Sequence, residues 1–245
     1  MFDTLNRSPL VQKLRQFVTN ETRLLISIGL VSGLVLTFLF IADLMIEGEV
    51  EAFDRSILML FRDPANPNQV IGPTWMHEMV RDITSLGSFA LLGLIVIGVC
   101  SYLLLAHKRI EAAVVAVSVV TGTILSTVLK MSYNRPRPEL EVMSHQFTSS
   151  FPSGHSLISA VTYLTLGAVL SRFAPTRQQR IFIFSLAVFL TLIVGLSRLY
   201  MGVHFPSDIL AGWCLGAAWA LLWSMVAFQL QSRGAIEKPD EDKHG

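Results

Sequence analysis

The sequence predicts an all-α, polytopic membrane protein with six membrane-spanning helices. Hydrophobic residues make up 52% of the 245 residues, and the mean hydropathy is +0.54. Charged residues make up only 15%, whereas a typical globular domain has roughly 25%. The apolar residues also stand in long, nearly uncharged runs, which amphipathic surface helices do not have. Composition and run length together argue against a soluble protein.

The bulk composition also narrows the function classes. The formal net charge is +1, so the chain lacks the basic excess that binds nucleic acid. Cys100 and Cys214 both fall inside apolar runs, where we expect small buried hydrophobes and no disulfide framework. Residues 1–23 are polar and mixed in charge, so we expect a cytoplasmic N-terminal segment without a cleavable signal peptide.

Six runs are long enough to cross the hydrocarbon core, which takes about 20 mostly apolar residues in a helix. The first run lies between Arg23 and Asp43, and the third ends at Lys130. The sixth begins near Asp208 and carries no further charge before Arg233. These runs predict a membrane domain over residues 24–232 and a polar, cytoplasmic tail over 233–245. The predicted spans are 24–42, 83–106, 112–129, 155–171, 181–197 and 208–232.

The longest connection, residues 43–82, contains a further helical pattern. Apolar residues recur at helical spacing within its segment 50–62, at Phe53, Ile57, Leu60 and Phe61. Charged residues stand between them. We therefore expect an amphipathic helix that lies in the membrane interface within the first outer loop.

Basic residues predict the orientation, because loops rich in Lys and Arg stay in the cytoplasm. The predicted spans place twelve basic residues on one side of the membrane and seven on the other. The side with twelve holds both termini and should be cytoplasmic. The seven residues expected outside are Arg55, Arg62, Arg81, Lys130, Arg135, Arg137 and Arg198.

Charged and polar residues concentrate in three short segments at the outer ends of spans three to six. These segments are 130–138 (KMSYNRPRP), 151–155 (FPSGH) and 197–208 (SRLYMGVHFPSD). Charges at membrane depth are costly, so they are functional hypotheses by default. Lys130, Arg137 and Arg198 place three cations on one face of the membrane, where they match the oxygens of a phosphate group. Prolines flank Arg137 and hold the chain extended there.

Two histidines complete this constellation. Ser153 opens span four and Gly154 permits close approach of the backbone, so the free N–H groups of this helix start point at the same oxyanion. His155 stands beside these donors, where it can protonate a leaving oxygen. Asp208 follows His204 by four residues and can accept its Nδ1–H, which leaves Nε2 free to attack.

The three segments resemble the type 2 phosphatidic acid phosphatase superfamily, whose pattern is K-x6-RP, then PSGH, then SR-x5-H-x3-D. Every specified position is present in order between Lys130 and Asp208. The resemblance implies a membrane lipid phosphatase that uses no metal and no cofactor. It implies that His204 is the nucleophile and forms a phosphohistidine, that Asp208 supports it, and that His155 is the general acid. The phosphate-binding groups that it implies are Lys130, Arg137, Ser153, the Gly154 N–H and Arg198.

Within that superfamily, six spans with short loops are most similar to bacterial phosphatidylglycerophosphate phosphatase B and undecaprenyl diphosphate phosphatase. This implies a bacterial inner membrane, and the distribution of basic residues predicts that the active site lies on its extracytoplasmic side. The motifs recognise only phosphate, so undecaprenyl diphosphate, phosphatidylglycerophosphate, phosphatidate and lipid A phosphate are all candidate substrates. A lipid phosphotransferase with the same histidine intermediate and a non-enzymatic lipid phosphate binder are the alternatives. Six spans argue against a soluble vanadate haloperoxidase, which shares the motif types.

Some residues also admit ordinary interpretations. Lys130 or Arg198 alone could be a snorkelling anchor at a span end, but three spaced motifs together favour the catalytic interpretation. Two roles stay open for Arg135, a contact with a phosphate or headgroup and a solvated charge in a loop. Gly212 and Gly216 form a GxxxG pattern, which here favours packing inside the bundle over dimerisation. The oligomeric state stays open.

Overall fold

The structure, a computed structural model, describes residues 9–138 and 148–232. Regular structure in these ranges is helical, apart from one isolated bridge between Arg62 and Val70. The N-terminal half contains α2 (Pro9–Ile46), α3 (Glu51–Met59), α4 (Thr74–Ser85) and α5 (Phe89–Leu105). The C-terminal half contains α6 (Arg109–Ser132), α7 (Gly154–Leu170), the short 3₁₀ helix η2 (Ser171–Phe173), α8 (Arg177–Tyr200) and α9 (Pro206–Ser232).

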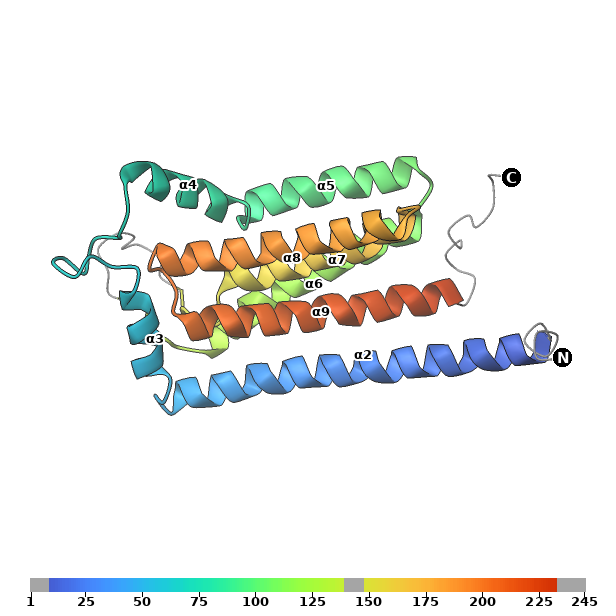
Figure 1. The fold of residues 1–245 in the computed structure, drawn as a ribbon, viewed down its shortest axis with the longest axis horizontal. Coiled ribbons are helices and arrows are strands. Elements are labelled where there is room, and N and C mark those ends of the chain that lie inside the picture. Colours follow the sequence, from blue (N-terminus) through green and yellow to red (C-terminus); the bar gives the residue numbers. More distant parts are fainter. Residues whose placement is uncertain (1–8, 139–147, 233–245) are drawn as a thin grey trace.

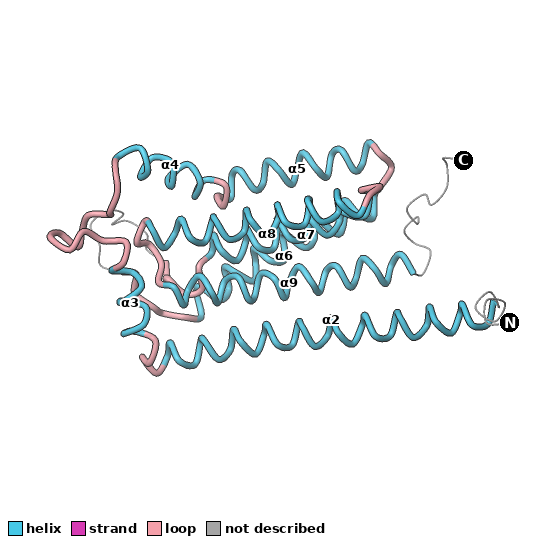
Figure 2. Tube along the Cα trace, viewed as in Figure 1, coloured by secondary structure: helices cyan, strands magenta, loops and turns pink. Residues whose placement is uncertain are grey.

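The described helices confirm the predicted all-α, multi-pass membrane fold. Five helices, α2, α6, α7, α8 and α9, are long and apolar enough to cross a membrane, and the bent pair α4–α5 can supply a sixth span. The long helices lie side by side, with α3, α4, the end of α6, the start of α7 and the α8–α9 connection at one end (Figure 1). The α5–α6 and α7–α8 connections lie at the opposite end, together with the first turn of α2 and the last turn of α9 (Figure 2).

The predicted second span, 83–106, is wrong as one continuous helix. The chain bends by 48° between α4 and α5. Ser88 starts a new helix there, because its Oγ accepts the Leu91 N–H at 3.3 Å. A Cβ on Gly87 would collide with Val194 of α8 and stand 3.2 Å from Cδ2 of His155. Glycine at position 87 therefore permits close packing of the break against α8 and α7, and Gly87-Ser88 is a helix-end and helix-start signal inside the apolar run.

Helix α7 is the centre of the bundle. Thirteen of its 17 residues are buried, and it packs against α6, α8 and α9. Helix α2 packs mainly on α9, and most of its membrane segment is exposed outside the bundle. Such a distribution is expected of a helix bundle in lipid, where outward-facing apolar side chains contact acyl chains.

Close contact between α7 and α9 depends on the two glycines of the GxxxG pattern. A Cβ on Gly216 would stand 2.6 Å from Cβ of Ala160 and 2.6 Å from the carbonyl oxygen of Leu157. A Cβ on Gly212 would stand 2.8 Å from the carbonyl oxygen of Ser153. Both glycines face α7 inside the bundle, so the prediction of internal packing is confirmed.

The ends of the chain and the outer loop differ in part from the sequence expectations. Helix α2 already begins at Pro9, so residues 9–23 of the expected N-terminal segment continue the first span. Residues 1–8 and the expected cytoplasmic tail, 233–245, lie outside the described residues. Helix α3 occupies the expected amphipathic segment, but Asp54 and Leu58 form its buried side, while Phe53 and Leu60 are exposed. Its location in the membrane interface stays a prediction.

Substitution of Gly216 by Ala should destabilise the bundle by about 1–3 kcal/mol, because overpacking of a close contact costs that much. Gly98 of α5 is the matched control, since a Cβ there meets no atom within 4 Å. Thermal unfolding in detergent should show a lower Tm for Gly216→Ala and an unchanged or higher Tm for Gly98→Ala. Equal Tm values for both variants would contradict the proposed contact.

The orientation in the membrane can be tested with single cysteines at the two ends of the bundle. Ala65 lies in the exposed α3–α4 connection, and Gln178 lies exposed in the first turn of α8 at the opposite end. In a background without Cys100 and Cys214, Ala65→Cys in intact cells should react with an impermeant maleimide. Gln178→Cys should react only after lysis. The reverse pattern would place the α3–α4 end in the cytoplasm.

Candidate active site

Helix α6 supplies Lys130 from its last turn. The Nζ atom donates to the carbonyl oxygen of Ser149 over 3.2 Å. A Cβ on Gly154 would stand 2.9 Å from Cε of Lys130, closer than packed carbon atoms approach one another. Glycine at position 154 therefore lets the lysine stem lie against the N-terminus of α7.

Arg137 is fixed by the chain on both sides of the site. Its Nε donates to the carbonyl oxygen of Thr148 at 3.1 Å, and its Nη1 donates to that of Val203 at 3.0 Å. Nη1 also lies 3.5 Å from Nε2 of His204. Burial lowers the pKa of Arg137 and Asp208 opposes this effect, but a guanidinium group stays charged in proteins. The contacts hold a positive charge beside the nitrogen that was predicted to attack.

Ser153 begins α7 and links it to α9. Its Oγ accepts the Ser156 N–H at 3.4 Å, and its own N–H donates to the carbonyl oxygen of Asp208 at 2.9 Å. N–H groups in the first turn of a helix have no acceptor within the helix. Those of Gly154 and His155 belong to this turn, so the start of α7 is a donor site for an oxyanion.

Arg198, in the last turn of α8, is only 3% exposed. Its Nη1 donates to Oγ1 of Thr84 at 3.2 Å. Among the described residues, its Nε and Nη2 atoms have no hydrogen-bond partner. Buried polar groups are almost always hydrogen-bonded, and two oxygens of a phosphate group are well suited to accept from this guanidinium fork.

The turn between α8 and α9 contains His204. Gly202 adopts φ +70°, a left-handed conformation that favours glycine. Its N–H donates to the carbonyl oxygen of Leu199, and the Val203 N–H donates to that of Arg198. These two bonds form a Schellman motif, which ends α8 and reverses the chain so that His204 turns back toward α7.

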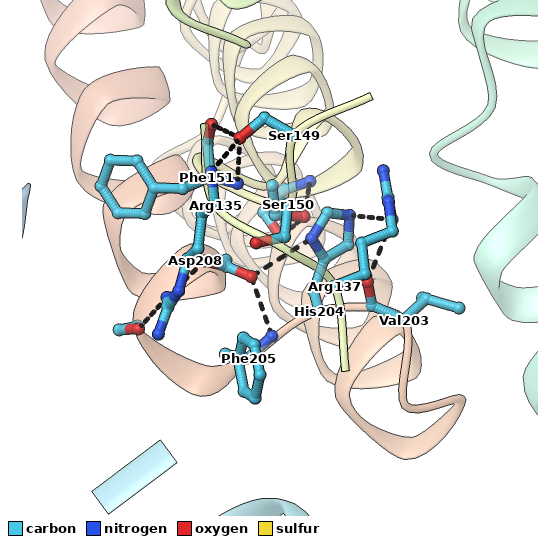
Figure 3. A network of polar contacts seen from close by, with 12 residues as sticks. Arg135, Arg137, Ser149, Ser150, Phe151, Val203, His204, Phe205 and Asp208 are labelled. Atoms are coloured by element: carbon cyan, nitrogen blue, oxygen red, sulfur yellow. Dashed lines mark hydrogen bonds and ion pairs between the residues drawn. The ribbon is translucent and has the colours of Figure 1, made fainter. Parts of the chain in front are cut away.

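Asp208 faces His204 from the first turn of α9 (Figure 3). Its Oδ2 accepts the Phe205 N–H at 2.9 Å and lies 3.5 Å from Nδ1 of His204, the outer limit of a hydrogen bond. Burial lowers the pKa of the His204 imidazole to about 4, with Asp208 opposing the shift and Arg198 and Arg137 adding to it. The ring is therefore neutral at ordinary pH, and Nε2 can offer an electron pair.

His155, in the first turn of α7, faces the cation cluster. It lies within electrostatic range of Arg198, His204, Lys130 and Arg137. It also packs against the break between α4 and α5 at Gly87. The structure thus brings the residues of all three predicted segments together at one end of the bundle, from four different helices and their connections.

Comparison with known proteins identifies the family. Residues 111–232, about half of the chain, match the family model described as PAP2 superfamily, and this range includes all three segments. The chain belongs to the PAP2 superfamily. It is 29% identical over 188 residues to phosphatidylglycerophosphatase B of Bacillus subtilis, which covers 75% of this chain and 88% of that protein. It is 36% identical over 92 residues to undecaprenyl-diphosphatase of Sulfolobus acidocaldarius, 38% of each protein.

A solved PAP2 structure supports the same assignment. The crystal structure of a transmembrane PAP2 type phosphatidylglycerolphosphate phosphatase from Bacillus subtilis superposes with a TM-score of 0.72 at 27% identity. The match covers 82% of this chain and 96% of that one. The similarity in fold therefore extends beyond the part of the chain that the family model matches.

Several residues at this PAP2 site were missed by the motifs. Thr84 holds Arg198, and Gly87 and Gly202 shape the backbone around the two histidines. Arg135 is not the solvated loop charge of one expectation, because its side chain is 8% exposed and pairs with Asp54 and Asp208 at 2.6 Å each. These pairs do not test the other expectation, a contact with a phosphate or headgroup. Asp54 lies 81 residues before Arg135, and an acidic residue in an outer loop gives no sequence signal of such a pairing.

Of two cavities in the described part of the structure, one adjoins the site through Arg137 and the other lies at the opposite end of the bundle. One of about 800 Å³ is bounded by the end of α2, by α3 and by segment 132–138, and its lining includes Arg135 and Arg137. Neither histidine lines it, and neither do Lys130 and Arg198. The other, of about 680 Å³, lies between α5, α7 and α8 at the opposite end of the bundle.

Proposed function

We propose that this PAP2 protein removes phosphate from a membrane lipid through a covalent phosphohistidine on His204. The observation that carries the proposal is the state of His204. Its imidazole is buried and neutral, and its Nε2 lies 3.5 Å from the Arg137 guanidinium within a cluster of three cations. A neutral nucleophile beside groups that attract phosphate is the arrangement that phosphoryl transfer requires.

The reaction proceeds in two steps. Nε2 of His204 donates its electron pair to phosphorus, while the P–O bond to the lipid breaks and its electrons stay on the leaving oxygen. His155 in its protonated form gives that oxygen a proton, so the lipid leaves as an alcohol. Water then attacks the phosphohistidine and passes its proton to His155, and the N–P bonding electrons return to Nε2. Phosphate leaves, and both histidines regain their starting states.

Asp208 supports the charged form of the nucleophile. Phosphorylation of Nε2 leaves a positive charge on the ring, with the remaining proton on Nδ1. The nearby Oδ2 of Asp208 stabilises that charge, as the buried aspartate does in catalytic triads. The present 3.5 Å separation is compatible with this role, because catalytic hydrogen bonds often tighten only when substrate is bound.

Lys130, Arg137 and Arg198 hold the phosphoryl group without a metal ion. In a loose transition state, negative charge spreads over the three equatorial oxygens of phosphorus. Three cations, Ser153 and the first-turn N–H groups of α7 can compensate that charge. We therefore propose that catalysis needs no metal and no cofactor.

Among the candidate lipids, we favour a phosphate monoester of the phosphatidylglycerophosphate type at the extracytoplasmic face of a bacterial inner membrane. The extended similarity to phosphatidylglycerophosphatase B supports this choice, since it covers 88% of that protein. Undecaprenyl diphosphate is the second candidate, supported by a match over 38% of an undecaprenyl-diphosphatase. A lipid phosphotransferase would differ only in the second step, where a lipid hydroxyl would replace water.

The two histidines should differ in their response to the leaving group. An alkoxide needs a proton as it departs, whereas a nitrophenolate does not, because its conjugate acid is already strong. His155→Ala should therefore lose roughly 10²–10⁴-fold in rate on phosphatidylglycerophosphate but much less on p-nitrophenyl phosphate. His204→Ala should lose phosphate release on both substrates, because it lacks the nucleophile.

Wild-type turnover of p-nitrophenyl phosphate establishes first that the small substrate enters the site. Phosphate release and thermal unfolding are measured for each variant, so that misfolding is recognised. Equal losses for His155→Ala and His204→Ala on both substrates would refute the division of roles. A reversed pattern would exchange them.

Phosphate release should survive an excess of EDTA. The reason is that three side-chain cations take the place of a metal at the phosphate oxygens. The measurement compares phosphate release from phosphatidylglycerophosphate before and after dialysis against EDTA. Inactivation that Mg²⁺ alone reverses would show that the cations are not sufficient.

A further inference from the structure

Arg135 is the centre of a buried ion-pair network beside the nucleophile. Its side chain is 8% exposed, and its two partners, Asp54 and Asp208, are fully buried. Nη2 of Arg135 lies 2.6 Å from Oδ2 of Asp54, and Nη1 lies 2.6 Å from Oδ1 of Asp208. The guanidinium also lies 4.5 Å from the centre of the Phe205 ring. One arginine therefore joins the outer-loop helix α3 to the first turn of α9.

Asp54 holds the start of α9 as well. Its Oδ1 accepts the backbone N–H of Ser207 at 2.9 Å, and its Oδ2 accepts the Ser207 hydroxyl. Ser207 in turn accepts from Nη1 of Arg135 at 2.8 Å. The first N–H groups of a helix lack acceptors within the helix and favour a nearby negative charge. A carboxylate from α3 thus caps α9 at Ser207, the residue directly before Asp208.

The two oxygens of Asp208 have separate partners. Oδ1 accepts from Arg135, whereas Oδ2 accepts the Phe205 N–H and faces Nδ1 of His204. A carboxylate with one anchored oxygen cannot rotate freely about its terminal bond. Arg135 therefore sets which oxygen of Asp208 faces the imidazole, and Asp54 sets where Arg135 lies.

We propose that Arg135 and Asp54 are positioning residues for the nucleophile, and that they act through Asp208 without touching the phosphate. The inference rests on the function proposed above. Both Nη atoms of Arg135 are engaged by carboxylates and Ser207. Arg137 differs, because its Nη1 lies beside Nε2 of His204. Within α3, Asp54 is the residue that takes part in positioning the nucleophile.

The test compares Arg135→Gln and Asp54→Asn with Arg55→Gln and Glu51→Gln as matched controls. Both control residues are exposed on α3. Arg55→Gln removes a positive charge as Arg135→Gln does, and Glu51→Gln removes a negative charge as Asp54→Asn does. Steady-state phosphate release from phosphatidylglycerophosphate gives kcat and KM. Inhibition by inorganic vanadate, a phosphate analogue, reports on the oxyanion pocket. Thermal unfolding identifies any variant that does not fold.

A misplaced nucleophile lowers kcat but leaves phosphate binding intact. Arg135→Gln and Asp54→Asn should each lose about 10²-fold in kcat, the size expected for a displacement of roughly 1 Å at a reacting group. KM and vanadate inhibition should stay near wild type, whereas Arg137→Gln should weaken vanadate inhibition. Arg135→Lys should lose less than Arg135→Gln, because it keeps the charge but can reach only one carboxylate well. The control variants should keep the wild-type kcat.

The double variant Asp54→Asn/Arg135→Gln tests whether the two residues act together. Its kcat should fall about as far as that of the more impaired single variant, because either change alone already breaks the contact from Asp54 through Arg135 to Asp208. It also removes the charges of Asp54 and Arg135 together, so it leaves fewer unpaired carboxylates than Arg135→Gln alone if that variant fails to fold.

Three results would overturn the inference. Unchanged kcat in folded Arg135→Gln would remove the positioning role, as would multiplicative losses in the double variant. Weaker vanadate inhibition at unchanged kcat would make Arg135 a phosphate-binding residue. A wild-type protein that releases no phosphate would instead refute the proposed function, and the positioning role would fall with it.

Discussion

Three cations, Lys130, Arg137 and Arg198, converge at one end of an apolar helix bundle, and their mutual repulsion is the constraint that the surrounding structure has to meet. Each pair repels more strongly than it would in water, because burial lowers the local dielectric constant. Asp208 acts electrostatically on Lys130 and Arg137 and thereby offsets part of this repulsion. A phosphate group, with charge on several oxygens, would offset more. Repulsion among the three cations destabilises the folded protein, and an anionic phosphate that binds among them relieves this repulsion. The cluster therefore favours binding of a phosphate group.

The three cations come from different elements, so the backbone has to hold them close together against their repulsion. Gly154 lets the Lys130 stem approach α7, and Gly202 ends α8 so that His204 turns back toward the site. The bond from Ser153 to the carbonyl oxygen of Asp208 fixes the starts of α7 and α9 to each other. Gly212 and Gly216 bring the rest of these two helices into contact. Side-chain chemistry and helix packing are thus set by the same few positions.

The spans and the motif residues could be predicted from sequence because both are local signals. A run of apolar residues is visible without any knowledge of neighbours, and so is the spacing of His204 from Asp208. The break at Gly87 has a sequence signal, Gly87 followed by Ser88, but the length of the apolar run outweighed it. Its contacts with Val194 and His155 are visible only in the fold. The partner of Arg135 was equally hidden. Asp54 stands in an amphipathic segment where a charge is expected to face water, and only the tertiary fold turns it inward.

The division of labour between the two halves of the chain follows from these contacts. Residues 111–232, which match the PAP2 superfamily, contain every residue proposed to touch phosphate. The N-terminal half adds groups that hold the site in place. Thr84 of α4 contacts Arg198, and Asp54 of α3 contacts Arg135 and Ser207, which neighbour Asp208. Helices α3 and α4 lie at the same end of the bundle as the site (Figure 1). Under the proposed function, the C-terminal half supplies the reacting groups, and the loop that carries α3 and α4 contributes contacts that orient them. A change in that loop can therefore alter catalysis without changing any residue of the motifs.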